Sequence, residues 1–240
     1  MLNLKNLMKL SFVGITGATV TCFHLLLTTS PALADSPLTS TFFGEAYQDV
    51  EIVQHVIKDG FDIKTINALG DPDLSNDVRV AIINQLIMTS VKKNGWFHNN
   101  YYTEIYLGYL SIKYGIKYTE ITPSILTAEE ALSLGYLLAF RQRFAIEENF
   151  QIRDKELEIN ALNLTDKALT ENEKDFAVAV INSLVVAQKY FRGGMNSWCQ
   201  VYQTFNSVEQ EFSSENRNMR PGAVDIIRNY INIYQKYCQN

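Results

Sequence analysis

The chain lacks the short motifs that identify most enzyme and cofactor sites. It contains no glycine-rich phosphate-binding loop, no dinucleotide-binding fingerprint, no serine nucleophile elbow and no zinc-binding pattern. Each absence removes the sequence evidence for one class of activity. We therefore predict no catalytic residue, no metal ligand and no cofactor.

Basic residues are too few and too scattered to form a positively charged run. The chain has 21 Lys and Arg against 26 Asp and Glu, a formal net charge of −5. Nucleic acids and anionic membranes are bound mainly through clustered Lys and Arg. The composition therefore argues against nucleic acid as a partner.

Long apolar runs are absent after residue 34, so we predict no transmembrane segment there. Before that point, Lys5 and Lys9 precede an apolar stretch at 10–27, and no acidic residue occurs before Asp35. This arrangement is typical of a secretory signal peptide. An uncleaved membrane anchor is the alternative, because the stretch is nearly long enough to span a bilayer.

The small-x-small sequence Ala32-Leu33-Ala34 matches the site that signal peptidase recognises. We therefore predict a signal-peptide helix at 1–34, cleavage between Ala34 and Asp35, and a single helical domain at 35–240. Loss of the signal's two lysines changes the net charge from −5 to −7. The expected location is the periplasm or the cell exterior.

Cysteine is scarce, and the predicted cleavage removes Cys22. Only Cys199 and Cys238 remain. In an oxidising compartment an even pair of cysteines predicts one disulfide. Two buried free thiols are the alternative.

Strand patterns are scarce, whereas helix signals are frequent. Thr127 and Glu130 form a capping box before an apolar run at 131–140, and Thr170 with Glu173 suggests a second before 176–191. Pro221 is placed to begin the last helix. We predict an all-α fold, a compact array of stacked helical hairpins with about 7–9 helices.

Other apolar residues recur at helical spacing. Phe42–Ile57 reads as one helix that ends at Gly60, and 198–212 carries a second apolar stripe. In the last helix a stripe that ends at Cys238 predicts that this cysteine lies on the buried side. Cys199 lies at the edge of the stripe in the preceding helix.

Two pairs of segments suggest weak internal repeats, and chance similarity in a Leu- and Ile-rich helical protein is the alternative. Asp77–Leu86 resembles Asp175–Leu184, and Leu-Gly-Tyr-Leu occurs at 107–110 and again at 134–137. Both longer segments are apolar nearly all round, so each predicts a central, buried helix. Asn84 and Asn182 would then need hydrogen-bond partners in the core.

The densest aromatic cluster is the candidate binding site. It contains Trp96, His98, Tyr101 and Tyr102, whose polar tips suit a ligand or glycan groove. The alternative is a loop between helices whose rings fill the edge of the core. We expect the segment to be largely buried in either case.

Two further patterns have structural alternatives. Glu51, His55 and Asp59 share a helix face and could bind a metal, but an ion-paired surface has the same spacing. Asp71–Asp77 resembles a calcium loop without its glycine and its bidentate Glu, and a turn with a helix cap explains it equally well.

Several segments resemble uncharacterised exported helical proteins of cyanobacteria. The segments that carry the resemblance are 32–40, 77–86, Leu134-Gly135-Tyr136-Leu137, Trp198-Cys199 and Met219-Arg220-Pro221. The resemblance implies a bacterial periplasm or cell exterior and no known activity.

These observations favour a non-catalytic exported protein that binds another protein or an envelope component, because helical arrays offer extended grooves. The alternative is a cell-envelope enzyme, such as a glycan hydrolase with a carboxylate or His98 in a cleft.

Overall fold

The computed structural model describes residues 36–94, 100–144 and 159–238. Internal contacts divide the chain into Met1–Asp35 and Ser36–Asn240, and the described residues all belong to the second unit. The predicted signal peptide and its cleavage site at Ala34 and Asp35 lie outside the described residues. Both stay predictions.

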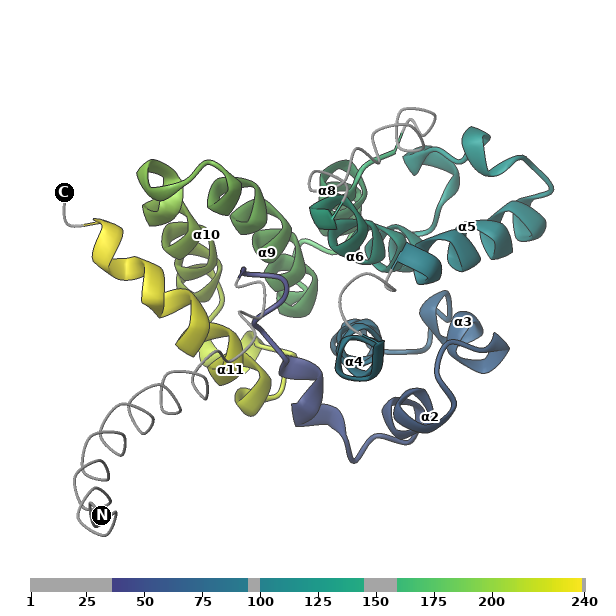
Figure 1. Ribbon diagram of the computed structural model, residues 1–240, viewed down its shortest axis with the longest axis horizontal. Helices are drawn as coiled ribbons and strands as arrows, with labels where there is room; N and C mark the ends of the chain where they lie inside the picture. The colour runs from purple at the N-terminus through teal and green to yellow at the C-terminus, as the bar shows by residue number, and fades with distance from the viewer. Residues whose placement is uncertain (1–35, 95–99, 145–158, 239–240) are drawn as a thin grey trace, which may run out of the picture. The chain divides into compact units, whose positions relative to one another are not determined.

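Within the described ranges the chain is helical, with nine α-helices and no strand, as predicted for an all-α fold (Figure 1). The α-helices are α2 (Glu51–Asp59), α3 (Ile63–Leu69), α4 (Asn76–Asn94), α5 (Asn100–Tyr114), α6 (Ala128–Phe144), α8 (Ala161–Glu171), α9 (Phe176–Arg192), α10 (Trp198–Glu211) and α11 (Pro221–Ile231). Short 3-10 helices join them: η1 (Phe43–Tyr47), η3 (Tyr118–Glu120), η4 (Pro123–Ile125), η5 (Met195–Ser197), η6 (Ser214–Asn216) and η7 (Asn232–Cys238). No described helix has both the length and the hydropathy of a membrane-spanning segment.

Several predicted helix boundaries are confirmed by their caps. The hydroxyl of Thr127 accepts a hydrogen bond from the Glu130 N–H, and the Glu130 carboxylate accepts one from the Thr127 N–H, so the box opens α6. Pro221 is the first residue of α11. Gly115 follows α5 with a φ of +66°, a conformation that glycine adopts without strain.

The predicted single helix at Phe42–Ile57 is wrong, because the chain forms η1, turns, and then begins α2. Gly44, inside η1, packs closely on α4. Its N–H donates to the Asn84 side chain over 2.9 Å, and a Cβ on Gly44 would lie 3.0 Å from backbone atoms of Ala81 and Gln85. Close packing on α4 therefore sets the path of η1.

The predicted capping box at Thr170 and Glu173 is also wrong. Thr170 lies inside α8, and its hydroxyl donates to the Asp166 carbonyl of the preceding turn. Asp175 caps α9 instead, because its carboxylate accepts the Val178 N–H over 3.1 Å. Two overlapping capping signals occur here, and the chain uses the later one.

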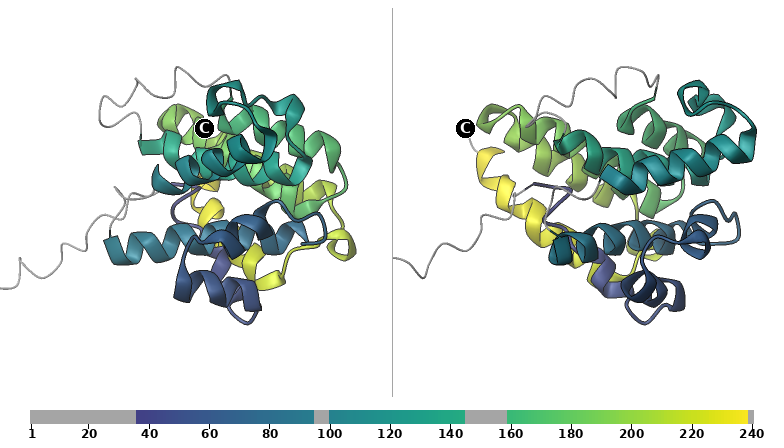
Figure 2. Two further views of the ribbon diagram at one scale, coloured as in Figure 1. Left: turned by 90° about the vertical axis from the view of Figure 1, so that its right-hand side faces the viewer. Right: turned by 45° about the vertical axis from the view of Figure 1, so that its right-hand side comes forward.

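The two helices predicted to be central are both largely buried. Figures 1 and 2 show α4 between α2 and α6, while α9 packs between α8 and α10. From Val80 to Ile83 every α4 side chain is inaccessible to solvent, and Phe176–Ile181 of α9 is buried throughout. Apolar residues on all sides of a helix therefore marked the interior correctly.

The buried asparagines of these helices have the partners that their burial requires. The Asn84 amide donates to the Thr41 carbonyl and the Tyr136 hydroxyl, and its oxygen accepts from Gly44. The Asn182 amide donates to Thr165 and Asp166 on α8. Each asparagine thus joins its helix to a neighbouring segment.

The segment that follows residue 35 enters the core. Ser36, Leu38, Thr39 and Thr41 are all at most 1% exposed. Hydrogen bonds hold the turn, since the Thr41 hydroxyl donates to the Pro37 carbonyl over 2.8 Å. Leu38 belongs to the same apolar core as α4 and α9.

The C-terminal segment is one continuous α-helix only as far as Ile231, and η7 continues from it. Ile227, Ile231 and Tyr234 are buried, as the stripe predicts, but Cys238 is only half-buried. The tighter 3-10 winding moves later residues away from the stripe expected for an α-helix.

Candidate functional site

The predicted aromatic site is only partly described. Trp96 and His98 lie outside the described residues. Tyr101 and Tyr102 open α5, but Tyr101 is 67% exposed, so the expectation of a buried aromatic segment is wrong at this residue. Tyr102 packs edge-on against Phe61, with 5.3 Å between ring centroids. Adjacent residues of a helix face different directions, which separates the two rings.

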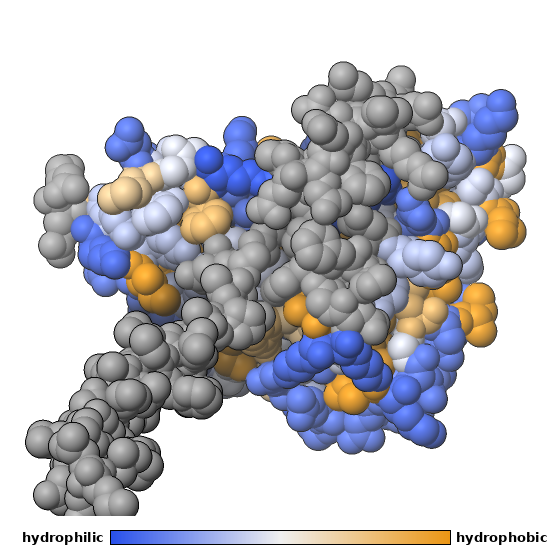
Figure 3. All heavy atoms as spheres, viewed as in Figure 1, coloured by the Kyte–Doolittle hydropathy of each residue, from blue (hydrophilic) through white to orange (hydrophobic). Residues whose placement is uncertain are grey.

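Tyr101 belongs to a different surface, which sequence reasoning missed. Tyr101, Ile105, Gly108 and Ile112 follow one another at steps of four, three and four residues, so they share one side of α5. Ile112 is 84% exposed, and Ile105 is half-buried. We call these four residues the α5 face. Figure 3 shows hydrophobic residues on the surface over α3 and α5.

Gly108 lies at the centre of the α5 face with free space in front of it. A Cβ built on Gly108 would meet no heavy atom of the described chain within 4 Å. Glycine in a helix interior is less favourable than alanine by about 1 kcal/mol. Nothing in the described structure requires a glycine at this position.

Gly135 provides an internal comparison, because it occupies the same place in the second Leu-Gly-Tyr-Leu sequence. It lies on α6 against α8, and a Cβ there would lie 2.9 Å from the Thr165 side chain and 3.0 Å from Leu164 Cβ. Only a residue without a side chain allows this approach. In one copy of the sequence the glycine is covered by a helix, and in the other it faces solvent.

The opposite side of α5 is firmly attached to the core. Tyr106, Leu107 and Leu110 are at most 3% exposed. At the helix C-terminus, Lys113 Nζ lies 2.6 Å from a Glu130 oxygen and the Tyr114 hydroxyl 2.5 Å from the other. The α5 face is therefore presented by a helix that is fixed at its far end.

Glu130 is a fully buried carboxylate whose geometry indicates a structural role. Its oxygens accept hydrogen bonds from Lys113, Tyr114 and the Thr127 N–H, and the residue is fully buried, so the carboxylate does not face an open cleft. Burial, followed by the hydrogen bond to Glu130, raises the pKa of Tyr114 to about 12. Glu130 joins α5 to the first turn of α6.

The acidic turn at Asp71–Asp77 wraps around an internal cation, the fully buried guanidinium of Arg79. This guanidinium donates to the carbonyls of Ala68, Leu69, Asp71 and Leu74 at 2.6–3.1 Å, and to the Asn76 side chain at 3.1 Å. Burial lowers the pKa of Arg79 from its usual value. Within this turn, the carbonyls of Asp71 and Leu74 thus accept hydrogen bonds from Arg79.

His55 does not form the predicted trio with Glu51 and Asp59. Its Nδ1 lies 3.1 Å from Asp59, its Nε2 lies 2.9 Å from Asp62, and Glu51 instead pairs with Lys64. The chain turn before α3 supplies Asp62, which helical spacing alone did not indicate. Among the described residues no group of three His, Cys, Asp or Glu side chains is placed to hold a metal ion.

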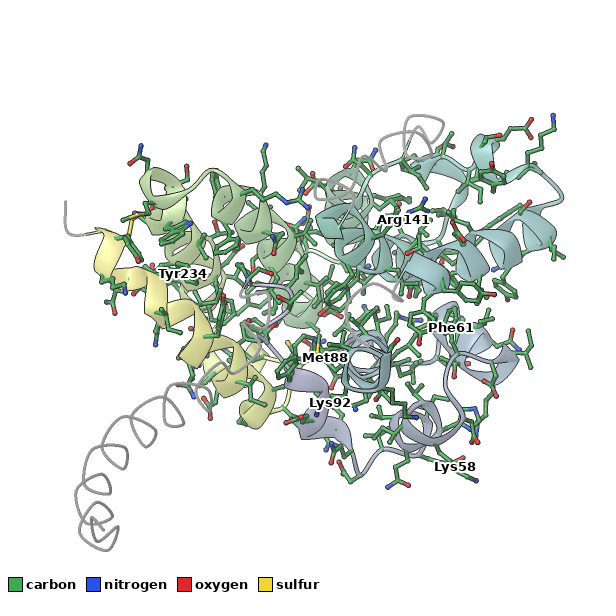
Figure 4. All side chains as sticks on the ribbon, viewed as in Figure 1. Lys58, Phe61, Met88, Lys92, Arg141 and Tyr234 are labelled. Carbon is green, nitrogen blue, oxygen red and sulfur yellow. A yellow bond between two sulfur atoms is a disulfide. The ribbon has the colours of Figure 1, made fainter. Side chains whose placement is uncertain are left out.

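The predicted disulfide is present in the structure, between Cys199 on α10 and Cys238 at the end of η7 (Figure 4). The two Cα atoms are 4.7 Å apart, within the range that disulfides span. Beside it, the Trp198 ring packs on Phe191, Tyr234 and Tyr237 at centroid distances of 4.8–5.8 Å. The bond and the ring cluster attach the C-terminal segment to α9 and α10.

No family model, no curated protein and no solved structure matches the chain. The resemblance to exported helical proteins of cyanobacteria therefore stays a prediction from the sequence. Function has to be argued from the surface of the molecule itself.

Proposed function

We propose that the chain is an exported, non-catalytic helical protein that binds a protein partner through the α5 face. The observation that supports this most strongly is the pair of glycines in the repeated Leu-Gly-Tyr-Leu sequence. Gly135 lies under α8, and Gly108 faces solvent at the centre of an apolar stripe.

The proposed partner segment is an amphipathic α-helix. On α6, the glycine allows α8 to approach so closely that an added methyl group would clash with Leu164 and Thr165. The separation of packed helices depends on the side chains at their contact, and small residues permit the closest approach. Gly108 offers the same opportunity to a helix from another molecule.

The exposed side chains around Gly108 support the same proposal. Ile112 and Tyr101 are large apolar or amphipathic residues, and both are mostly exposed. Apolar residues gathered on one surface, unlike single exposed ones, commonly mark interaction sites. Helix recognition typically uses apolar side chains at these i, i+3, i+4 and i+7 spacings.

Export is part of the proposal and is supported by the predicted signal peptide. A disulfide between Cys199 and Cys238 fits an oxidising compartment such as the periplasm or the cell exterior. The partner could then be a protein of the envelope. A stacked-hairpin architecture with internal repeats remains part of this proposal too.

A photo-crosslinking residue at position 112 tests the proposed surface in the native host. We expect it to capture a defined protein, and mapping of the joined peptide should place the crosslink in a helical segment. Adding the substitution Gly108→Phe to this crosslinking variant should abolish capture, because the phenylalanine ring would occupy the space proposed for the partner helix. It should not impair folding, since the space is open in the described structure.

The matched control places the same crosslinker at Ile233, which is 51% exposed on η7. Capture of the same protein from position 233, or unchanged capture by the Gly108→Phe variant, would contradict the α5 face as the binding surface. An adduct of twice the chain's mass would show instead that the partner is a second copy of the chain.

A further inference from the structure

A second surface feature, separate from the α5 face, is a cavity of about 220 Å³ between the N-terminal segment, α6, α8 and α9. Its walls are mainly apolar and include Leu38, Ala139, Leu162 and Val185. At roughly 30 Å³ per water-sized group, the space admits about seven such groups. That is smaller than the pockets of most drug-sized ligands.

Gln188 also lines the cavity, and its side chain is not fully satisfied. The residue is 5% exposed, and its Oε1 has no hydrogen-bond partner among the described residues. Buried polar atoms without a partner are rare, and each calls for an explanation. The terminal torsion of glutamine is broad, so the amide can turn at small cost and present its N–H donors to an acceptor in the cavity.

The charged residues at the cavity are cationic. Lys189 and Arg192 lie in the last turn of α9 and line the cavity, while no carboxylate occurs among its described lining residues. Lys189 is exposed and forms no ion pair within the described chain. Lys189 therefore places a positive charge without an ion-pair partner in the described chain at the edge of an apolar space.

We propose that this cavity binds a small amphiphilic anion, whose apolar body enters between α6 and α9 and whose carboxylate remains near Lys189. Hexanoate, with its short apolar tail, is a suitable probe for a cavity of about 220 Å³. The proposal is independent of the α5 face, because no described α5 residue lines the cavity.

The test is titration of the purified protein with sodium hexanoate, hexylammonium chloride and sodium acetate, followed by calorimetry and by the NMR signals of Leu38 and Val185. We expect hexanoate to bind and to shift both signals. Hexylammonium should bind at least five-fold more weakly because its charge is reversed, and acetate should not bind measurably because it lacks the apolar body.

Two variants separate the apolar and the charged contributions. Ala139→Leu fills part of the cavity and should abolish hexanoate binding, while Lys189→Gln should weaken it about five-fold. Lys93→Gln, at an exposed lysine on α4, is the matched control and should change nothing. Circular dichroism establishes that each variant is folded.

Equal binding of hexanoate and hexylammonium would overturn the assignment of an anion. Absence of hexanoate binding to the folded wild-type protein, or unchanged binding to the folded Ala139→Leu variant, would overturn the site itself. None of these outcomes bears on crosslinking at the α5 face, so the two proposals can fail separately.

Discussion

Arg79 holds the junction between α3 and α4 through five hydrogen bonds, four of them to backbone carbonyls. Two of these carbonyls, at Ala68 and Leu69, belong to the last turn of α3, whose oxygens have no partner within the helix. Arg79 therefore stabilises this helix end, where the Ser133 hydroxyl also donates to Leu69, and closes the acidic turn after it.

Substitution of Arg79 should be severe. Arg79→Ala removes five hydrogen bonds made by a fully buried cation and leaves an unfilled space, so we expect a loss of about 3 kcal/mol or more in the free energy of unfolding. Arg79→Lys should keep only part of the stability that arginine provides, because an ammonium offers three N–H donors in place of five. Urea denaturation measures both, with Lys93→Ala as the control. A loss below about 1 kcal/mol for Arg79→Ala would contradict this role.

Asp62 predicts a pH dependence at the start of α3. The Thr65 N–H, and next the His55 ring, lower the pKa of Asp62 from 3.8 to about 2. A lowered pKa means that the carboxylate stabilises the fold above pH 4, and that this contribution is lost as the pH falls from about 4 to about 2.

Asp62→Asn tests this directly, because asparagine can still cap the helix but cannot ionise. We expect the variant to be less stable than the wild type at pH 7, and the difference to shrink as the pH falls to about 2. The free energy of unfolding of both proteins, measured from pH 7 to about pH 2, tests this expectation, with Asp73→Asn as the control. A difference that stays constant with pH would rule out the ionised carboxylate as its source.

Among the elements, α5 and α6 offer a paired experiment at their glycines. Gly108→Ala should stabilise the isolated protein by about 0.5–1 kcal/mol, because alanine favours the helix and the added methyl group meets no described atom. Gly135→Ala should destabilise it by about 1–3 kcal/mol, because the same methyl group would overlap α8.

Thermal unfolding of the two variants side by side gives the comparison, and each serves as the other's control. A stabilising Gly135→Ala would show that α8 does not approach α6 as closely as described, and a destabilising Gly108→Ala would show that the isolated fold requires this glycine. A stabilising Gly108→Ala would also mean that this glycine is not needed by the isolated fold, which is what a binding role requires.

The disulfide is the other prediction at this scale. Cys199 and Cys238 are 39 residues apart, and closing such a loop is worth about 4 kcal/mol in the chain-entropy estimate. We expect Cys238→Ser, or reduction, to destabilise the fold by a few kcal/mol and to increase hydrogen exchange in η7 first, because chain ends fray when they are not attached.

Free-thiol titration of the unfolded, non-reduced protein should come before these stability measurements, because it tests whether the bond exists. No reactive thiol at Cys199 or Cys238, with an unchanged monomer mass, is the expected result. Two reactive thiols would contradict the bond, and the ring cluster around Trp198 would then be the main attachment of η7.

For the whole molecule, the sequence makes one prediction about processing. We expect the exported protein to begin at Asp35, because Ala32-Leu33-Ala34 matches a signal-peptidase site. Mass spectrometry of the exported fraction measures this directly. A full-length mass recovered from the membrane fraction would instead support the uncleaved anchor.

The sequence by itself determined the class of fold and the interior. Helical periodicity predicted α6, α9 and α11, and the caps at Thr127 and Pro221 predicted where α6 and α11 begin. The two helices that are apolar on all sides, α4 and α9, are largely buried, because burial leaves no side for polar residues. The even pair of cysteines, Cys199 and Cys238, was likewise sufficient to predict their bond.

Only the tertiary structure decided which polar and apolar groups meet. Local patterns at Phe42–Ile57 and Thr170 were overridden by packing of Gly44 on α4 and by the cap at Asp175. The partners of Arg79 and His55 come from turns whose position in space no spacing rule gives. Periodicity could identify the residues of the α5 face, but whether this face is exposed depends on which helices cover it. Gly108 and Gly135 lie in the same four-residue sequence, and only the position of α8 distinguishes a packed glycine from an open one.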